Sequence, residues 1–74
     1  MHGGGTLSEL RIGRVDGRTV LILDDGSSLW AFRGSQSDVA RLVALGHGGT
    51  DIRPSMEPVG AFTGVSVPIG RIDP

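Results

Sequence analysis

The chain has 74 residues, seven basic against eight acidic ones, a formal net charge of −1 and no cysteine. A chain of this length is one domain with a marginal core, because it buries only about 60% of its unfolded surface. The absence of cysteine excludes a disulfide scaffold and thiol chemistry. The balanced charge does not favour a nucleic-acid footprint. Stabilisation by a protein partner or by self-association is therefore expected.

All seven basic residues are Arg, and Lys and Asn are absent while Gly occurs 13 times. This bias is typical of a G+C-rich genome, such as that of an actinobacterium or one of its phages. No apolar run approaches the roughly 20 residues that span a bilayer, so no membrane partner is expected. Residues 1–7 are Gly-rich and lack the basic and apolar regions of a signal peptide. They predict a flexible leader before a single domain at 8–74, in a cytoplasmic protein.

A three-stranded antiparallel meander is predicted in the first half of the chain, with strands at about 9–15, 18–24 and 28–33. Asp16-Gly17 lies between two apolar runs and is a strong signal for a two-residue hairpin, because both turn positions need a positive φ. The continuous apolar run 20–23 is typical of a central strand that is buried on both faces. The acidic and glycine residues of 24–27 predict the second turn.

Loop lengths predict the register of this meander. A two-residue first loop pairs Leu10 with Leu23, and a two- or four-residue second loop sets Leu21 opposite Trp30. Cross-strand partners share a face, so one face carries Leu10, Ile12, Leu21, Leu23, Trp30 and Phe32. The other face carries Val20, Ile22, Leu29 and Ala31, edged by Arg11, Arg18 and Arg33. A three-residue second loop would instead exchange the faces of the third strand.

A helix is predicted at about 36–45. Ser35 and Asp38 approximate a capping box at its start. The segment Val39–Val43 places apolar residues at the i, i+3, i+4 spacing of a buried helical stripe. Gly46 is predicted to stop the helix. A helix of this length covers one face of a three-stranded sheet, which leaves the second apolar face to be covered by something else.

Further β segments are predicted at about 50–53 and 64–72. Pro68 cannot donate a hydrogen bond to a ladder, so the last segment is expected to be an edge strand or to carry a bulge. The fold class is therefore α+β, and closure into a small SH3-like barrel is one arrangement open to these strands. The tail from Val59 to Ile72 either covers the second face of the sheet or reaches onto another chain.

No catalytic, cofactor or metal site is recognisable in the sequence. Asp24 and Asp25 lack the alternating acidic ligands of a calcium loop, and neighbouring strand residues point to opposite faces. His2 and His47 are isolated among glycines and lack the further ligands that zinc needs. The glycine-rich segment 46–49 follows a helix, whereas a phosphate loop leads into one. Neither an enzyme, nor a cofactor, nor a small-molecule substrate is expected.

The candidate interaction residues are Trp30, Phe32, Arg11, Arg18, Arg33, Val65 and Val67. Trp30 is either a core residue, which its size favours, or an interface anchor. Arg side chains beside aromatic rings on a sheet are typical of single-strand binders. In the predicted register, however, Trp30 and Phe32 lie on the opposite face from Arg11 and Arg18, which favours solvated strand flanks for the arginines.

These observations favour a small non-enzymatic protein-interaction module, such as an adaptor, inhibitor or modulator that binds a partner protein or itself as a homodimer. The first alternative is a small β-barrel that binds nucleic acid. The second alternative is a virion or assembly accessory protein whose end segments become ordered on assembly.

Overall fold

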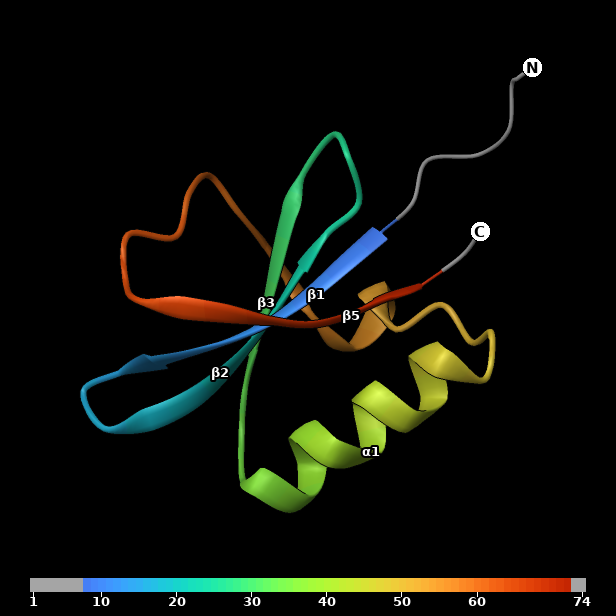
Figure 1. Ribbon diagram of the computed structural model, residues 1–74, viewed down its shortest axis with the longest axis horizontal. Helices are drawn as coiled ribbons and strands as arrows, with labels where there is room; N and C mark the ends of the chain where they lie inside the picture. Colours follow the sequence, from blue (N-terminus) through green and yellow to red (C-terminus); the bar gives the residue numbers. More distant parts are fainter. Residues whose placement is uncertain (1–7, 73–74) are drawn as a thin grey trace.

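The structure is a computed structural model that describes residues 8–72, in which a helix lies against an antiparallel sheet (Figure 1). The strands are β1 (Ser8–Val15), β2 (Arg18–Asp24), β3 (Leu29–Arg33), β4 (Glu57–Val59) and β5 (Ser66–Ile72). The helix α1 spans Gln36–His47, and a single 3-10 turn, η1, spans Arg53–Ser55. The α+β class and the meander are confirmed. The predicted leader lies outside the described residues.

The strand order is β4-β3-β2-β1-β5, with every neighbouring pair antiparallel. β4 and β5 form the two edges and do not pair with each other within the described residues. The sheet is therefore open, and the described strands do not close into an SH3-like barrel.

The hairpin between β1 and β2 has the predicted register, with Leu10 opposite Leu23. Asp16 and Gly17 have φ angles of 52° and 77°. Both turn residues are thus in the left-handed region, which matches the right-handed twist of the flanking strands.

The pairing of β2 with β3 differs from the prediction by two residues. Leu21 faces Phe32 instead of Trp30, and Trp30 faces Leu23. The reason is that the loop consists of residues 25–28, whereas the predicted turn was at 24–27. A shift by an even number of residues leaves every side chain on its predicted face.

The main core lies between α1 and one face of the sheet. Its buried members are Leu10, Leu21, Leu23, Val39, Leu42, Ile52 and Met56. The helix begins as predicted, because the Ser35 Oγ accepts a hydrogen bond from the Asp38 N–H at 3.1 Å. Val39 and Leu42, two residues of the predicted helical stripe, are buried against the sheet.

The predicted end of the helix is wrong. Gly46 lies inside α1 and is buried, four residues after Leu42 on the same side of the helix. The helix continues to His47, and the Gly48 N–H bonds to the Ala44 carbonyl at 3.0 Å. Gly49, with φ of 98°, supplies the left-handed residue in place of Gly46. Packing of Gly46 against the core thus outweighs its tendency to stop a helix.

The strand predicted at 50–53 is also wrong. Arg53–Ser55 forms η1 instead, with proline in its first turn, where the missing N–H costs no hydrogen bond. Ile52 and Met56 are buried on either side of this turn and anchor it to the core. The next residues, Glu57–Val59, form the short edge strand β4 beside β3, where no strand was predicted.

The second face of the sheet is covered by residues 60–65 of the same chain. This segment joins β4 to β5 at opposite edges, and it lies on the side of the sheet away from α1 (Figure 1). A Cβ added to Gly13 would lie 2.6 Å from the Cζ of Phe62, so the ring occupies the space that a side chain on β1 would need. Val20 and Ile22 on this face are only 1% and 2% exposed. The tail therefore covers the second face in cis.

Substitution of Gly13 by Ala tests this contact. We expect a loss of about 1–3 kcal/mol in the free energy of unfolding, the usual cost of overpacking a filled site. Urea unfolding measures it. Gly60→Ala is the matched control, since its Cβ would meet nothing within 4 Å. In a Phe62→Ala background most of the cost of Gly13→Ala should be lost, leaving the 3.1 Å approach of the Val65 carbonyl oxygen to the new Cβ. Equal stabilities of the two glycine variants would contradict the proposed cover.

Candidate functional site

The described residues offer surfaces more than an enclosed site. Within residues 8–72, no three His, Cys, Asp or Glu side chains are grouped so that they could hold a metal ion. In the same part of the chain, no helix has the length and apolarity needed to cross a membrane. The distinctive surface features are a hydrogen-bonded cluster, two hollows and an exposed apolar strip.

The structure does not bring the seven predicted interaction residues together. Trp30 and Phe32 are half-buried and pack against the core on the α1 side of the sheet. Arg18 and Arg33 are exposed on the opposite face, as the predicted register requires. Val65 is exposed in the loop before β5, and Val67 is exposed on β5 itself.

Arg11 has a structural position between β1 and β5. Its Nε donates to the Ser66 Oγ at 2.9 Å, and one terminal nitrogen donates to the Ser66 carbonyl at 3.1 Å. The other terminal nitrogen pairs with Glu9 at 3.0 Å. These contacts hold the Arg11 guanidinium against the start of β5, whereas the side chains of Arg18 and Arg33 are exposed.

Trp30 belongs to a polar clasp that joins the β2–β3 loop to the segment after α1. Its indole N–H donates to Asp25 Oδ2 at 3.0 Å, and Arg53 approaches the same oxygen at 3.3 Å. Arg53 is held in turn by a bidentate contact with Asp51, at 2.8 and 2.9 Å. We call Asp25, Trp30, Asp51 and Arg53 the Asp25 clasp. It satisfies the indole N–H at the edge of the core.

Hydrogen bonds set the charge state of the Asp25 clasp. The backbone N–H groups of Ser27 and Ser28 donate to Asp25, at 3.0 and 2.8 Å, and are the main cause of its strongly lowered pKa. Trp30 and Arg53 add to this lowering. The contact with Arg53 lowers the pKa of Asp51, while Asp51 chiefly raises the pKa of the Arg53 guanidinium. All three groups are thus held in their charged forms.

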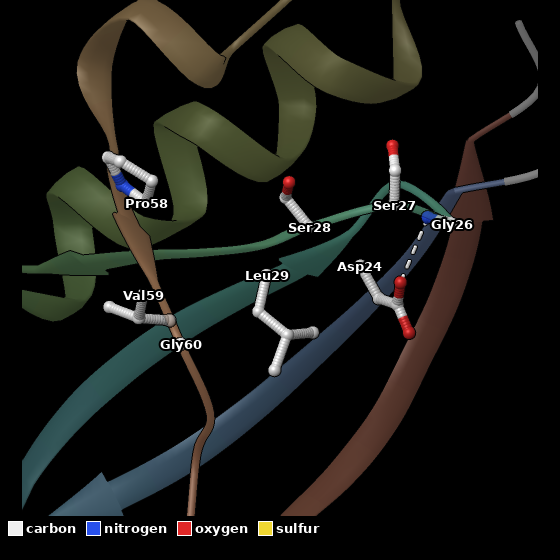
Figure 2. Close-up of a pocket in the computed structure, with 8 residues that line it drawn as sticks. All are labelled: Asp24, Gly26, Ser27, Ser28, Leu29, Pro58, Val59 and Gly60. Atoms are coloured by element: carbon white, nitrogen blue, oxygen red, sulfur yellow. Dashed lines mark hydrogen bonds between the residues drawn. The ribbon is translucent and has the colours of Figure 1, made fainter.

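A groove of about 660 Å³ lies between the tip of the β2–β3 hairpin and the end of β4 (Figure 2). It is lined by Asp24, Gly26, Ser27, Ser28, Leu29, Pro58, Val59 and Gly60. Leu29 and Val59 are cross-strand partners and contribute its apolar part. The Asp24 carboxylate accepts a hydrogen bond from the Gly26 N–H at 2.9 Å, so it stabilises the turn. The groove thus combines aliphatic side chains with exposed seryl hydroxyls.

A smaller hollow of about 350 Å³ lies on the same face of the sheet, near the β1–β2 turn. We call it the Arg hollow; it is lined by Val15, Asp16, Arg18, Val20 and Arg33. The ion pairs among residues 8–72 involve the guanidinium groups of Arg11 and Arg53. Neither Arg18 nor Arg33 has a carboxylate partner within 4.0 Å in that part of the chain.

An apolar strip follows the outer edge of β5. Val65, Val67 and Ile69 are 85%, 56% and 39% exposed, and we call them the β5 strip. Val65 and Val67 were predicted as interaction residues, and Ile69 continues the same alternation of apolar residues in the sequence. β5 is an edge strand with a register shift opposite Leu10 and Arg11, which confirms both expectations drawn from Pro68.

Comparison with known protein families, curated proteins and solved structures found no match. The described residues define a small α+β domain with an open five-stranded antiparallel sheet.

Because of the Asp25 clasp, we expect the stability of the fold to fall in acid. Because the pKa of Asp25 in the folded protein lies below its ordinary value of 3.8, ionised Asp25 stabilises the fold above about pH 4. This contribution is lost as the pH falls further. We expect the urea midpoint to drop between about pH 5 and pH 2, and to drop less in Asp25→Asn.

The dominant role of backbone hydrogen bonds gives a second readout. Because they contribute more than the charge of Arg53, the pH dependence should persist in about 0.5 M salt, where exposed ion pairs are screened. Identical pH profiles for the wild type and Asp25→Asn would contradict this account of the clasp.

Proposed function

We propose that this chain is a small protein-interaction module that binds a partner protein or a second copy of itself through the β5 strip. The observation that carries the proposal is the grouping of exposed aliphatic side chains at one sheet edge. Among the described residues the large exposed hydrophobic side chains are Leu45, Val65, Val67 and Ile69. Three of these four belong to the β5 strip. Contiguous apolar patches of this kind mark interaction sites in soluble proteins.

The covering of both sheet faces supports the β5 strip as the interface. Both apolar faces are already covered by the chain itself, one by α1 and the other by residues 60–65. A partner is therefore not needed to hide Val20 and Ile22. The β5 strip remains uncovered, and a partner that buried it would remove its apolar surface from water.

The backbone of β5 supports contact through side chains in preference to strand addition. Pro68 has no N–H to offer, and the irregularity near Ile69 disturbs the regular alternation of the edge. β4, at the other edge, is short and has Pro58 at its centre. Both edges thus carry features that discourage pairing with a further strand.

Binding of nucleic acid is less well supported. Trp30 and Phe32 pack on the α1 side of the sheet, so they cannot stack bases beside Arg18 and Arg33 on the opposite face.

The test is the double substitution Val65→Ser and Val67→Ser, with Leu45→Ser as a matched control. Leu45 is 42% exposed but belongs to α1 and not to the strand that carries the strip. Sedimentation velocity over a concentration series measures self-association, and quantitative affinity capture measures partner binding. We expect the double variant to weaken association about tenfold or more, because interface anchors each contribute more than 1 kcal/mol. Leu45→Ser should leave it unchanged.

The double variant should fold normally, since exposed substitutions usually change stability by less than about 0.5 kcal/mol. A wild-type protein that stays monomeric, and whose captured proteins do not depend on the β5 strip, would refute the proposal.

A further inference from the structure

The Arg hollow has a spacing of positive charges that follows from the register of β2 and β3. Val20 is the cross-strand partner of Arg33, and Arg18 precedes Val20 by two residues on β2. Arg18 and Arg33 are therefore diagonal neighbours on one face, with Cα atoms about 7–8 Å apart. Val15 is the cross-strand partner of Arg18 and adds an apolar wall beside it.

This spacing matches one simple kind of ligand. In an extended chain, side chains in alternate positions point the same way and are about 7 Å apart. Two carboxylates separated by one residue can therefore face the two guanidinium groups together. Arginine is suited to such contacts, because its planar group binds a carboxylate through two parallel hydrogen bonds.

We propose that the Arg hollow binds an extended acidic segment of a partner protein, with Asp or Glu residues in alternate positions. The inference rests on the proposed function as a protein-interaction module, but it concerns a different surface from the β5 strip. The two exposed guanidinium groups have no carboxylate partner within residues 8–72. An acidic segment would supply the missing charge complementarity.

The other charged groups near the hollow limit what it can accept. Asp16 lines the same hollow and reduces its positive potential. Arg14 lies on the neighbouring strand, and its guanidinium donates to the Gly17 carbonyl at 2.8 Å. The protein as a whole has a net charge of −1, which disfavours a long polyanion.

Stacking groups are also missing where a nucleic acid would need them. The ring of Phe62 is packed against the Gly13 and Gly64 backbones, and the other aromatic rings of the described residues lie on the α1 side of the sheet. A short acidic peptide segment therefore fits the hollow better than a nucleic-acid strand.

Fluorescence anisotropy of the full chain with labelled peptides tests the inference. The probe is a short peptide with Glu at alternate positions and Ser between them. Its control has the same composition, with the Glu residues in one block followed by the Ser residues. We expect the alternating peptide to bind more tightly, and binding to weaken as salt is added.

Variants assign the binding to the Arg hollow. Arg18→Gln and Arg33→Gln should each weaken binding about three- to tenfold, the range of a charge-assisted contact at a partly exposed site. Arg41→Gln, on the exposed side of α1, is the matched control and should have no effect. Asp16→Asn should tighten binding, because it removes the opposing charge while keeping a residue that tolerates the φ of 52°.

Three outcomes of the peptide measurements would overturn the inference. They are no binding of the alternating peptide at low salt, equal binding of the block peptide, and equal effects of the Arg41 and Arg18 substitutions. Tighter binding of an oligothymidylate that depends on Arg18 and Arg33 would assign the hollow to nucleic acid and would also overturn it. The Val65→Ser and Val67→Ser variant should still bind the peptide, so failure here is distinguishable from failure of the β5 strip as an interface.

Discussion

The rest of the structure depends on a central strand that is apolar on both faces. Residues 20–23 of β2 are all buried, with between 0% and 4% of each residue exposed. Because consecutive strand residues point to opposite faces, such a strand needs a layer on each side. α1 supplies one layer through its buried stripe, and residues 60–65 supply the other. Gly13 allows the second layer to lie close, since Phe62 occupies the space of a side chain on β1.

The strand order is linked to the same requirement. Placing β4 and β5 at opposite edges makes the connection between them cross the sheet, and this crossing brings Phe62 against Gly13, the cross-strand partner of Val20. A connection between neighbouring strands at one edge would not cross that face. The arrangement has a consequence for binding, because it leaves two open edges, each with a proline near its centre. Cover of the faces is thus combined with protection of the edges against further strands.

Local signals predicted the parts of the fold that have local causes. Asp16-Gly17 fixed the first hairpin, Ser35 the start of α1, and Pro68 the edge position of β5. The errors lie where distant packing decides. Gly46 stays helical because it joins the buried side of α1, and β4 forms where Ile52 and Met56 have anchored the preceding turn. The contact of Phe62 with Gly13 joins residues that are distant in the sequence and has no periodic signature. The sequence therefore predicted that the second apolar face needs a covering layer, but not which residues form it.

The same distinction between local signals and packing of distant residues applies to the candidate surfaces. The opposite faces of Trp30 and Arg18 followed from alternation together with an even-numbered second loop, whereas the hydrogen bonds of Arg11 to Ser66 depend on the pairing of β1 with β5. The two surfaces that remain differ in physical character. An aliphatic strip favours association without regard to charge, while a pair of arginines discriminates among partners by charge and spacing. With strand addition discouraged at both edges, the proposed interface at the β5 strip and the proposed acidic-segment site at the Arg hollow can act on one partner only if it contacts both an edge and a face of the sheet. Such a partner must wrap around the β1–β5 side of the domain.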